Sequence, residues 1–255
     1  MADTISLTAP DPPDRQPLSI EAAIDLLARG DIDVQGLLPW SSNYTFLVVV
    51  KQDDLQAMAV YKPCRGERPL WDFPRGTLAN REVAAYLVSQ ALGWLIVPPT
   101  VLRDGPHGTG MLQLYIEADP NEHYFTFGAL FPDQFKKLAL FDALVNNADR
   151  KAGHCLRDAG DHVWSIDHGI CFHEEPKLRT VIWEFARQPI PPDLMNDLRG
   201  FRGRLGSRSG AVAKALNQLL ALGEMAALRR RTDQLIAQAR FPNPGSDRHI
   251  PWPPV

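Results

Sequence analysis

The chain has 255 residues, of which 45% are hydrophobic and 22% charged, and a formal net charge of −3. This composition is typical of a globular protein that can bury a substantial core. The small negative charge argues against a protein that binds nucleic acid through its overall charge, so we expect no nucleic-acid partner.

The three cysteines, Cys64, Cys155 and Cys171, are odd in number and include no Cys-x-x-Cys pair. A disulfide framework or zinc ribbon is therefore not expected. No apolar run reaches the ~20 residues that span a bilayer, and the N-terminus lacks the basic segment and apolar core of a secretory signal. We expect a reduced, cytoplasmic protein without a transmembrane segment.

Residues 1–17 contain four prolines and three aspartates and predict a disordered N-terminal segment. After it, Ser19 suits an N-cap, an apolar face begins at Ile20, and Gly30 ends the helix. Three runs with the composition of strands follow: Val34–Leu38, Thr45–Val50 and Ala57–Tyr61.

A second helix is expected over Asn80–Leu92, with Val83, Ala84, Leu87 and Ala91 on one apolar side. Thr100–Leu102 and Met111–Ile116 predict two more strands around a glycine-containing turn. The first ~115 residues therefore predict a five-stranded antiparallel sheet with one inserted helix.

From Asp133 the pattern becomes helical up to a polar loop, and it is helical again after Asp167. The later helices are expected at Leu178–Arg187, Pro192–Phe201, Ser209–Leu222 and Glu224–Ala239. We predict an α+β fold of two lobes, with a sheet lobe over 18–117, a helical lobe over 118–241 and a Pro-rich tail over 242–255. Ligand sites favour the cleft between two such lobes.

The polar loop carries Asp149, and the turn Asp167-His168-Gly169 follows eighteen residues later. A β-hairpin between them would bring the two carboxylates to one cleft, where one could handle a proton and the other a cation. Phosphoryl transfer needs this division of labour, because its chemistry is mostly positioning and charge neutralisation.

The spacing inside this loop is typical of kinases, in which a metal-binding asparagine follows the catalytic aspartate by five positions. Here Lys151 lies two positions after Asp149, and His154 lies five positions after it. Asp167-His168-Gly169 stands where kinases have Asp-Phe-Gly, so the order of the motifs is retained but one metal ligand is changed.

Four features of the first half fit the same chemistry. Lys62 ends an apolar strand and could hold phosphates, and Glu82, twenty residues later, could pair with it. The polar turn Ser41-Ser42-Asn43 could aim backbone N–H groups at phosphate oxygens, and the strand from Gln113 could read an adenine edge. Taken singly, each has an ordinary alternative: a solvated lysine, a helix-dipole glutamate, a hairpin turn and a core strand.

Together these segments resemble, in the same order, the motifs of the phosphatidylinositol 3-/4-kinase superfamily, with the type II phosphatidylinositol 4-kinases most similar. The span from Leu38 to Trp183 is also similar to an actinobacterial family of kinase-like proteins, with which it shares the Glu67–Pro74 block and the Asn146–Lys151 run. The segments that carry the resemblance are Ser41–Phe46, Ala59–Pro63, Ile96–Thr100, Gln113–Glu117, Asn147–Arg150 and Ile166–Gly169.

The resemblance implies a small two-lobed protein-kinase-like fold that binds ATP and Mg²⁺ or Mn²⁺. Ser41, Ser42 and Asn43 would cover the phosphates, and Lys62 would hold the α- and β-phosphates while paired with Glu82. The adenine hinge would be Gln113, Leu114, Tyr115 and Ile116. Asp149 would orient and deprotonate the acceptor, Lys151 would face the γ-phosphate, and Asp167 would bind the metal.

His154 departs from the family pattern, because imidazole suits Mg²⁺ less well than a carboxamide oxygen does. Three outcomes follow. Either His154 ligates Mn²⁺ or another metal, or it leaves the metal to Asp167 and Asn147, or the site binds nucleotide without turning it over.

Four functions therefore stay open: an ATP-dependent phosphotransferase, a nucleotide-binding pseudokinase or regulator, an adenylyl transferase on the same fold, and a metal-dependent hydrolase. The hydrolase would use Asp149, His154, Asp167, His168 and His173. The acceptor is not fixed by these motifs, and a protein, a small molecule or a lipid is equally compatible with them. We expect its contacts in Pro176–Glu184. Trp71 and Phe73 are expected near the mouth of the cleft, packed against the sheet lobe, with contact to a membrane or a partner as the alternative.

Overall fold

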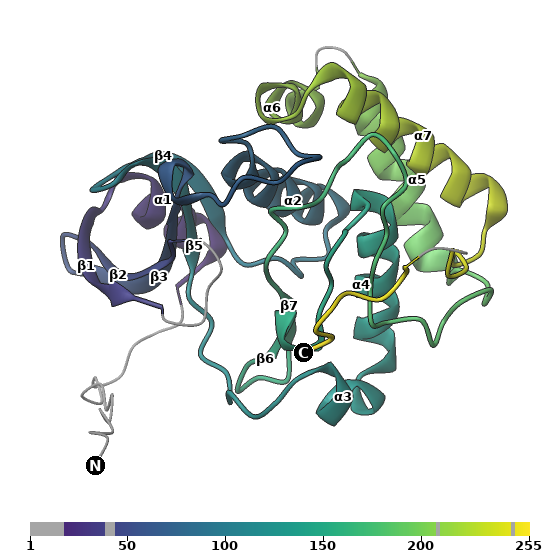
Figure 1. Cartoon of the computed structure of the whole chain (residues 1–255), viewed down its shortest axis with the longest axis horizontal. Helices are drawn as coiled ribbons and strands as arrows, with labels where there is room; N and C mark the ends of the chain where they lie inside the picture. The colour runs from purple at the N-terminus through teal and green to yellow at the C-terminus, as the bar shows by residue number, and fades with distance from the viewer. Residues whose placement is uncertain (1–17, 39–43, 208–209, 246–247) are drawn as a thin grey trace.

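The computed structural model describes residues 18–38, 44–207, 210–245 and 248–255. A curved sheet forms one side of the molecule and a group of helices forms the other (Figure 1). The predicted disordered segment 1–17 and the polar turn Ser41-Ser42-Asn43 lie outside the described residues.

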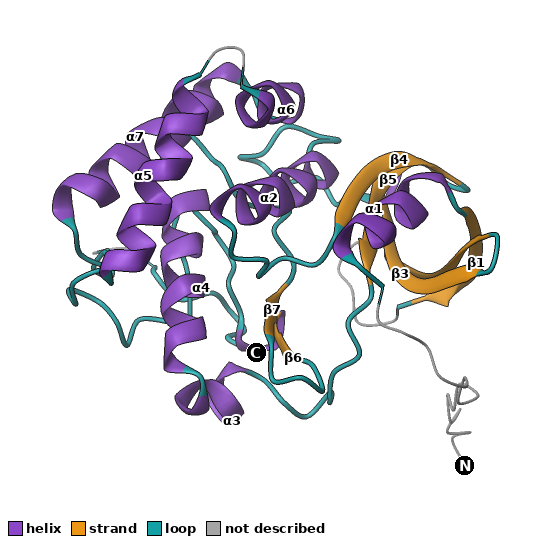
Figure 2. Ribbon diagram, turned by 180° about the vertical axis from the view of Figure 1, so that it is seen from behind, coloured by secondary structure: helices purple, strands orange, loops and turns teal. Residues whose placement is uncertain are grey.

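The sheet is antiparallel, with strand order β1-β2-β3-β5-β4. Helix α1 (Ile20–Arg29) packs in its curve, where Leu26 and Leu27 meet Val48, Ala59 and Tyr61 in a small buried core (Figure 2). The strands are β1 (Asp31–Leu37), β2 (Phe46–Gln52), β3 (Leu55–Pro63), β4 (Thr100–Gly105) and β5 (Gly108–Leu114). The predicted five-stranded sheet is confirmed, with strand ends displaced by one to three residues.

Helix α2 (Leu78–Leu92) lies between the two lobes and is buried on nearly all sides. Ala79 and Val83 pack against Met111 of the sheet, whereas Ala84 and Val88 belong to the core of the helical lobe. The predicted single apolar side is therefore wrong, because a helix sandwiched between two layers is apolar all round. The predicted sheet lobe over 18–117 thus shares α2 with the helical lobe.

The helical lobe surrounds α4, whose buried residues belong to its core and which packs against α7 (Figure 1). A short hairpin connects the two aspartate segments, as the sequence predicts. The elements are α3 (Tyr124–Phe127), α4 (Pro132–Val145), β6 (Cys155–Arg157), β7 (Val163–Ser165), α5 (Pro192–Gly206), α6 (Ala211–Leu219) and α7 (Leu222–Gln238).

The helix predicted at Leu178–Arg187 is absent. Instead, the backbone N–H of Arg150 donates to the carbonyl of Arg179 at 2.9 Å, and the N–H of Val181 donates to the carbonyl of Arg150 at 3.1 Å. Thr180 accordingly forms a parallel bridge with Arg150. The segment satisfies its backbone against the loop that carries Asp149, and this pairing outweighs its local helical pattern.

The C-terminal tail lies against the same loop. The N–H of Ala152 donates to the carbonyl of Pro254 at 2.8 Å, and the N–H of Thr180 donates to that of His249 at 3.0 Å. The predicted Pro-rich tail therefore packs on the loops that form the site. No helix in the described part of the chain has the length and apolar character needed to cross a bilayer.

Candidate active site

Lys62, at the end of β3, reaches two carboxylates. Its Nζ lies 3.0 Å from Glu82 Oε1 of α2, and it also contacts Asp167 Oδ1. Burial disfavours the charge on Lys62, but Asp167 and Glu82 outweigh it and raise the pKa of the lysine. The predicted contact with Glu82 is present, and the role of this lysine in holding phosphates stays a prediction.

Glu82 also fixes the turn that carries Asp167. Its Oε2 accepts the backbone N–H of His168 at 2.8 Å, and its side chain is 3% exposed. Asp167 itself has a φ of 63°, in the left-handed region that few residues other than glycine adopt. The carboxylate of one α2 residue therefore holds both the lysine and the strained turn.

Asp149 is positioned from the end of α4. The helix ends at Asn146, whose φ is 56°, and the chain then turns into the loop. Asn147 Oδ1 accepts the N–H of Asp149 at 2.9 Å, and Asn147 Nδ2 donates to Asp142 at 2.9 Å. Both polar atoms of Asn147 are occupied, so a metal-binding role for this residue would require these hydrogen bonds to break.

The carboxylate of Asp149 has a weak electrostatic partner. Its Oδ2 lies 3.9 Å from Lys151 Nζ, and its side chain is 32% exposed. Burial raises the pKa of Asp149 to about 6, with the negative charge of Asp167 adding to this and Lys151 opposing it. Such a carboxylate can accept a proton near neutral pH.

Asp167 is in the opposite electrostatic environment. Lys62 holds its pKa well below the usual range despite burial, and His154 Nε2 lies 3.3 Å from Asp167 Oδ2. Burial lowers the pKa of His154 to about 4, so its ring is neutral at pH 7. Because Nδ1 accepts the N–H of Lys151 at 3.4 Å, the ring proton is on Nε2, facing Asp167.

This arrangement bears on the predicted metal site. Asp167 supplies two oxygens of the type that Mg²⁺ prefers, and magnesium sites of this kind use one or two carboxylates together with substrate phosphates. With the ring proton on Nε2, His154 presents an N–H rather than a lone pair to Asp167, so in this tautomer that nitrogen is not a metal ligand. The residues fit a divalent cation held by Asp167, with His154 available only after its ring proton moves.

Arg150 is a site residue that the sequence reasoning missed. Its guanidinium is fully buried and pairs with Asp142 of α4, with Nε 3.0 Å from Asp142 Oδ2. It also donates to the carbonyl oxygens of His154 and Ile166, at 3.2 and 2.8 Å. One side chain thus joins α4, the Asp149 loop and the residue before Asp167. A lone Asp142 inside the otherwise apolar run Leu138–Val145 was the available signal.

The cleft next to these groups holds a cavity of about 210 Å³. Its lining combines residues of both lobes: Lys62, Glu67, Arg68, Leu70, Leu78, Ala79, Glu82, Met111, Asp149, His154, Asp167, Gly169 and Ile170. Of the fourteen predicted site residues, five therefore line one cavity: Lys62, Glu82, Asp149, His154 and Asp167.

The predicted adenine hinge is only partly available. The N–H of Leu114 donates to Pro99 O at 2.9 Å, and the N–H of Tyr115 donates to Met58 O at 3.0 Å. Gln113 is buried and donates its amide to Thr100 at 2.8 Å. Among these residues, Ile116 keeps a backbone N–H for which the described chain provides no acceptor.

The segment after Asp167 is fastened to the insertion before α2. Lys177 Nζ lies 2.8 Å from Asp72 Oδ2 and also stacks 5.1 Å from the ring centre of Trp71. Phe73 is buried, but it packs against the His173 ring of the helical lobe, and Trp71 is 93% exposed, so the expected packing of both on the sheet lobe is wrong. The segment after Asp167 is therefore tied to this insertion by an ion pair.

The two remaining histidines of the hydrolase alternative have structural contacts. His168 is buried and bonds Arg150 and Ser165, while His173 bonds the carbonyl of Asp72. Within the described ranges, no three His, Cys, Asp or Glu side chains gather closely enough to bind a metal. The geometry gives the hydrolase alternative no support.

No protein-family model matches the chain. Mycobacterium tuberculosis protein Rv2133c is 40% identical over 264 residues, covering 89% of this chain and 94% of that protein. Phosphatidylinositol 4-kinase gamma 4 of Oryza sativa subsp. japonica is 31% identical over 182 residues, and gamma 2 of Arabidopsis thaliana is 25% identical over 228. These matches cover 60% and 69% of this chain but only 32% and 41% of the plant enzymes.

Solved structures share the fold at low identity. A hydra Fam20 with sugar aligns at a TM-score of 0.61 and 16% identity, covering 86% of this chain and 88% of that one. The Golgi casein kinase with Mn/ADP bound aligns at 0.55 and 15%, covering 86% and 75%. The predicted two-lobed kinase-like fold is confirmed, and the plant relatives confirm the distant resemblance to phosphatidylinositol 4-kinases.

Proposed function

Because the chain belongs to the actinobacterial family that includes Rv2133c, and because it has a kinase-like fold, we propose that it is an ATP-dependent phosphotransferase. It transfers the γ-phosphate of ATP to a hydroxyl acceptor. The observation that carries the proposal is one lysine, Lys62, held by Glu82 and Asp167 in a cavity that Asp149 also lines.

Each residue has one role in the proposed reaction. Lys62 binds the α- and β-phosphates, and Lys151 offers a second positive charge to the γ-phosphate. Asp149 orients the acceptor hydroxyl and takes its proton, for which a pKa of about 6 is suited. Asp167 would hold Mg²⁺ or Mn²⁺, and such a cation supplies charge neutralisation to the phosphates.

The environment of His154 favours a second candidate, a nucleotide-binding regulator without turnover. Both oxygens of Asp167 are engaged, one by Lys62 and the other by His154 at 3.3 Å. A metal that cannot displace these partners would leave a site that binds nucleotide weakly or without chemistry. The raised pKa of Asp149 weighs against this candidate, since a binding site alone has no use for a base.

The test is analysis of nucleotides after incubation of the protein with ATP and either Mg²⁺ or Mn²⁺. ADP formed by the wild type but not by Asp167→Ala is the expected result. AMP with pyrophosphate would replace the proposal with nucleotidyl transfer. ATP-dependent thermal stabilisation without any product would establish the second candidate, and neither product nor stabilisation would overturn both.

Asp161→Ala is the matched control. Asp161 lies in the turn between β6 and β7, its side chain is 63% exposed, and its partner is Arg157 rather than a cleft residue. Its replacement removes a carboxylate of the same type close in sequence, so turnover at the wild-type rate is expected. A loss of turnover equal to that of Asp167→Ala would mean that the assay reports folding.

A further inference from the structure

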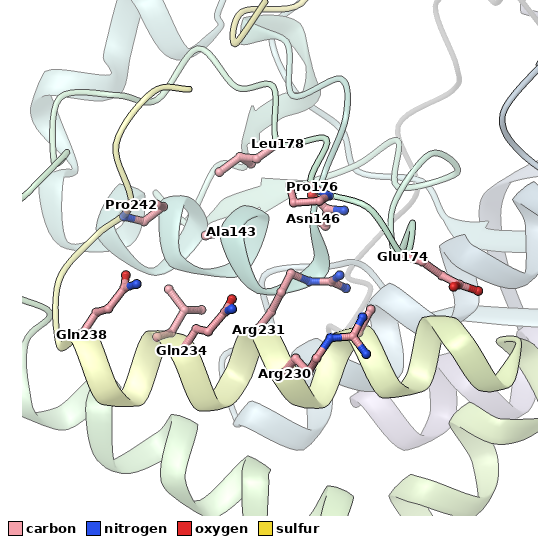
Figure 3. A pocket seen from close by; sticks show the side chains of 12 residues that line it. Ala143, Asn146, Glu174, Pro176, Leu178, Arg230, Arg231, Gln234, Gln238 and Pro242 are labelled. Carbon is pink, nitrogen blue, oxygen red and sulfur yellow. The ribbon is translucent and has the colours of Figure 1, made fainter. Parts of the chain in front are cut away.

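A cavity of about 390 Å³ lies between helix α7 and the segment that follows Asp167 (Figure 3). It shares no lining residue with the cleft. Its volume is at the lower end of the ~300–1,000 Å³ typical of small-molecule sites. No residue of the proposed phosphoryl-transfer site contributes to it.

One wall of the cavity is a polar stripe on α7. Arg230, Gln234 and Gln238 are spaced by four residues, so they lie along one face of the helix. Figure 3 shows these side chains rising from α7 toward the segment that contains Pro176 and Leu178. The cavity therefore has a cationic end, a row of amides and an apolar wall opposite them.

Arg231 provides a cation with an unused donor at the cavity. Its Nε donates to Leu144 O at 2.9 Å and its Nη1 donates to His173 O at 3.0 Å. Its Nη2 is buried and has no hydrogen-bond partner in the described chain. Burial lowers the pKa of Arg231 to about 10, with Arg230 adding to the effect. Glu224 partly offsets this effect but is already paired with Arg81, so an anion in the cavity would further stabilise the charge of Arg231.

The carboxylate that lines the cavity, Glu174, does not neutralise these arginines. It forms no ion pair with either arginine, and it packs against Gly223 in the first turn of α7, where a side chain on residue 223 would overlap it. A carboxylate beside the N-terminal end of a helix is stabilised by the helix dipole. The arginine pair thus keeps its positive charge for a ligand.

We propose that this cavity binds a phosphate monoester of a small polar molecule. The phosphate binds the exposed guanidinium of Arg230, since guanidinium groups bind phosphate with paired, charge-assisted hydrogen bonds, and the charge of Arg231 beside it adds to the attraction. The rest of the ligand lies along Gln234 and Gln238, whose amides both donate and accept hydrogen bonds. This site goes beyond the proposed function, and its occupation needs no ATP.

Occupation of the cavity would brace the segment that follows Asp167. Asn146 Nδ2 donates to the carbonyls of His173 and Glu175, at 3.0 and 2.7 Å, and Lys177 pairs with Asp72 of the sheet-side insertion. A ligand held by Arg230 adds a tie between α7 and this same segment. A ligand in this cavity would therefore act as an effector that reduces the motion of the segment after Asp167.

The test is thermal unfolding with inorganic phosphate or glycerol 3-phosphate, against KCl at matched ionic strength and without nucleotide. At ten times Kd, the wild type should gain about 3 °C in Tm. Arg230→Gln should weaken the affinity about 10-fold, which corresponds to one lost charge-assisted contact. Gln234→Leu should weaken binding of glycerol 3-phosphate more than that of inorganic phosphate.

Arg229→Gln is the matched control. Arg229 is the neighbouring residue on α7, but its Nε donates to Leu205 O of α5, so the same charge is lost away from the cavity. Arg230→Gln is diagnostic because Arg231→Gln would also remove the hydrogen bonds to Leu144 and His173. Equal shifts for the wild type and Arg230→Gln, or no response to inorganic phosphate, glycerol 3-phosphate or phosphatidic acid vesicles, would overturn the site.

A phosphate monoester occurs on lipids as well as on soluble metabolites, and vesicles containing phosphatidic acid separate the two sources. Arg230-dependent binding to such vesicles, with none to glycerol 3-phosphate, supports the site with a lipid as its ligand.

Hydrogen exchange provides the structural readout. Glycerol 3-phosphate should slow exchange of the Lys177 amide, which donates to Asn146 Oδ1 at 2.8 Å, in the wild type but not in Arg230→Gln.

Discussion

Two aspartates border the same cleft and have opposite electrostatic environments. Asp167 contacts Lys62 and has His154 Nε2 at 3.3 Å, and its pKa is held well below the usual range. Asp149 has its nearest cation 3.9 Å away, and burial raises its pKa to about 6. The difference shows that residue type does not assign roles here. The partners of each carboxylate make one a fixed anion and the other a candidate base.

The largest expected effect comes from neutralising each aspartate in turn. Asp149→Asn should lower kcat by about 10²–10⁴-fold while nucleotide affinity stays near the wild-type value, because a general base acts on the chemical step. Asp167→Asn should abolish turnover and also weaken metal-dependent nucleotide binding. Turnover assays with titration of a fluorescent nucleotide measure both quantities. Asp149→Asn with more than a tenth of wild-type kcat would end its assignment as the base.

Removing Arg150 should disrupt the buried hydrogen bonds that position the segments carrying the two aspartates. Arg150→Met leaves the buried Asp142 carboxylate unpaired, so the free energy of unfolding should fall by about 3–5 kcal/mol. Urea unfolding measures it. Arg157→Met is the matched control, since Arg157 forms solvent-exposed pairs with Glu122 and Asp161 that contribute little to stability. Similar losses for both variants would contradict the structural role of Arg150.

The pH dependence of turnover separates the two carboxylates. Asp149 must be ionised to accept a proton, so kcat/KM should be constant above pH 6 and fall about tenfold per unit below it. Asp167 stays ionised throughout this range because its pKa is depressed. Since Lys151 lowers the pKa of Asp149, Lys151→Met should move the acidic limb to higher pH. Lys136→Met is the control, because Lys136 pairs with Asp133 and does not line the cleft. If the acidic limb of the pH profile does not move in Lys151→Met, the limb reports the ionisation of a group other than Asp149.

A smaller effect is expected at His154. Replacing it with asparagine removes the ring that faces Asp167 and supplies a carboxamide oxygen, which suits Mg²⁺ better than imidazole does. The Mg²⁺ concentration for half-maximal turnover should fall a few-fold, with a smaller change for Mn²⁺. Metal titrations of the two proteins measure this. A rise in the Mg²⁺ requirement would show that the histidine has a positive role in holding the cation.

The sequence predicted the sheet because strand and turn patterns are local. It also predicted the contact between Lys62 and Glu82 and the hairpin between Asp149 and Asp167, since these follow from the order of the motifs. It failed at Leu178–Arg187, where helical spacing was overridden by backbone pairing with Arg150. The adenine hinge stays a prediction, and the pairing of the Leu114 and Tyr115 N–H groups with Pro99 and Met58 could not be read from the local sequence.

The sequence alone determined which ionisable groups this protein has and in what order they occur, and this order was enough to indicate a kinase-like fold. Only the tertiary structure decided their charge states and their partners. Burial, together with the distances from Lys62 to Asp167 and from Lys151 to Asp149, sets the two aspartate pKa values apart. Packing of α7 against the segment after Asp167 likewise forms the arginine-lined cavity, which no local sequence pattern predicts. Electrostatic energy depends on separation in space and on exclusion of water, and spacing along the chain specifies neither.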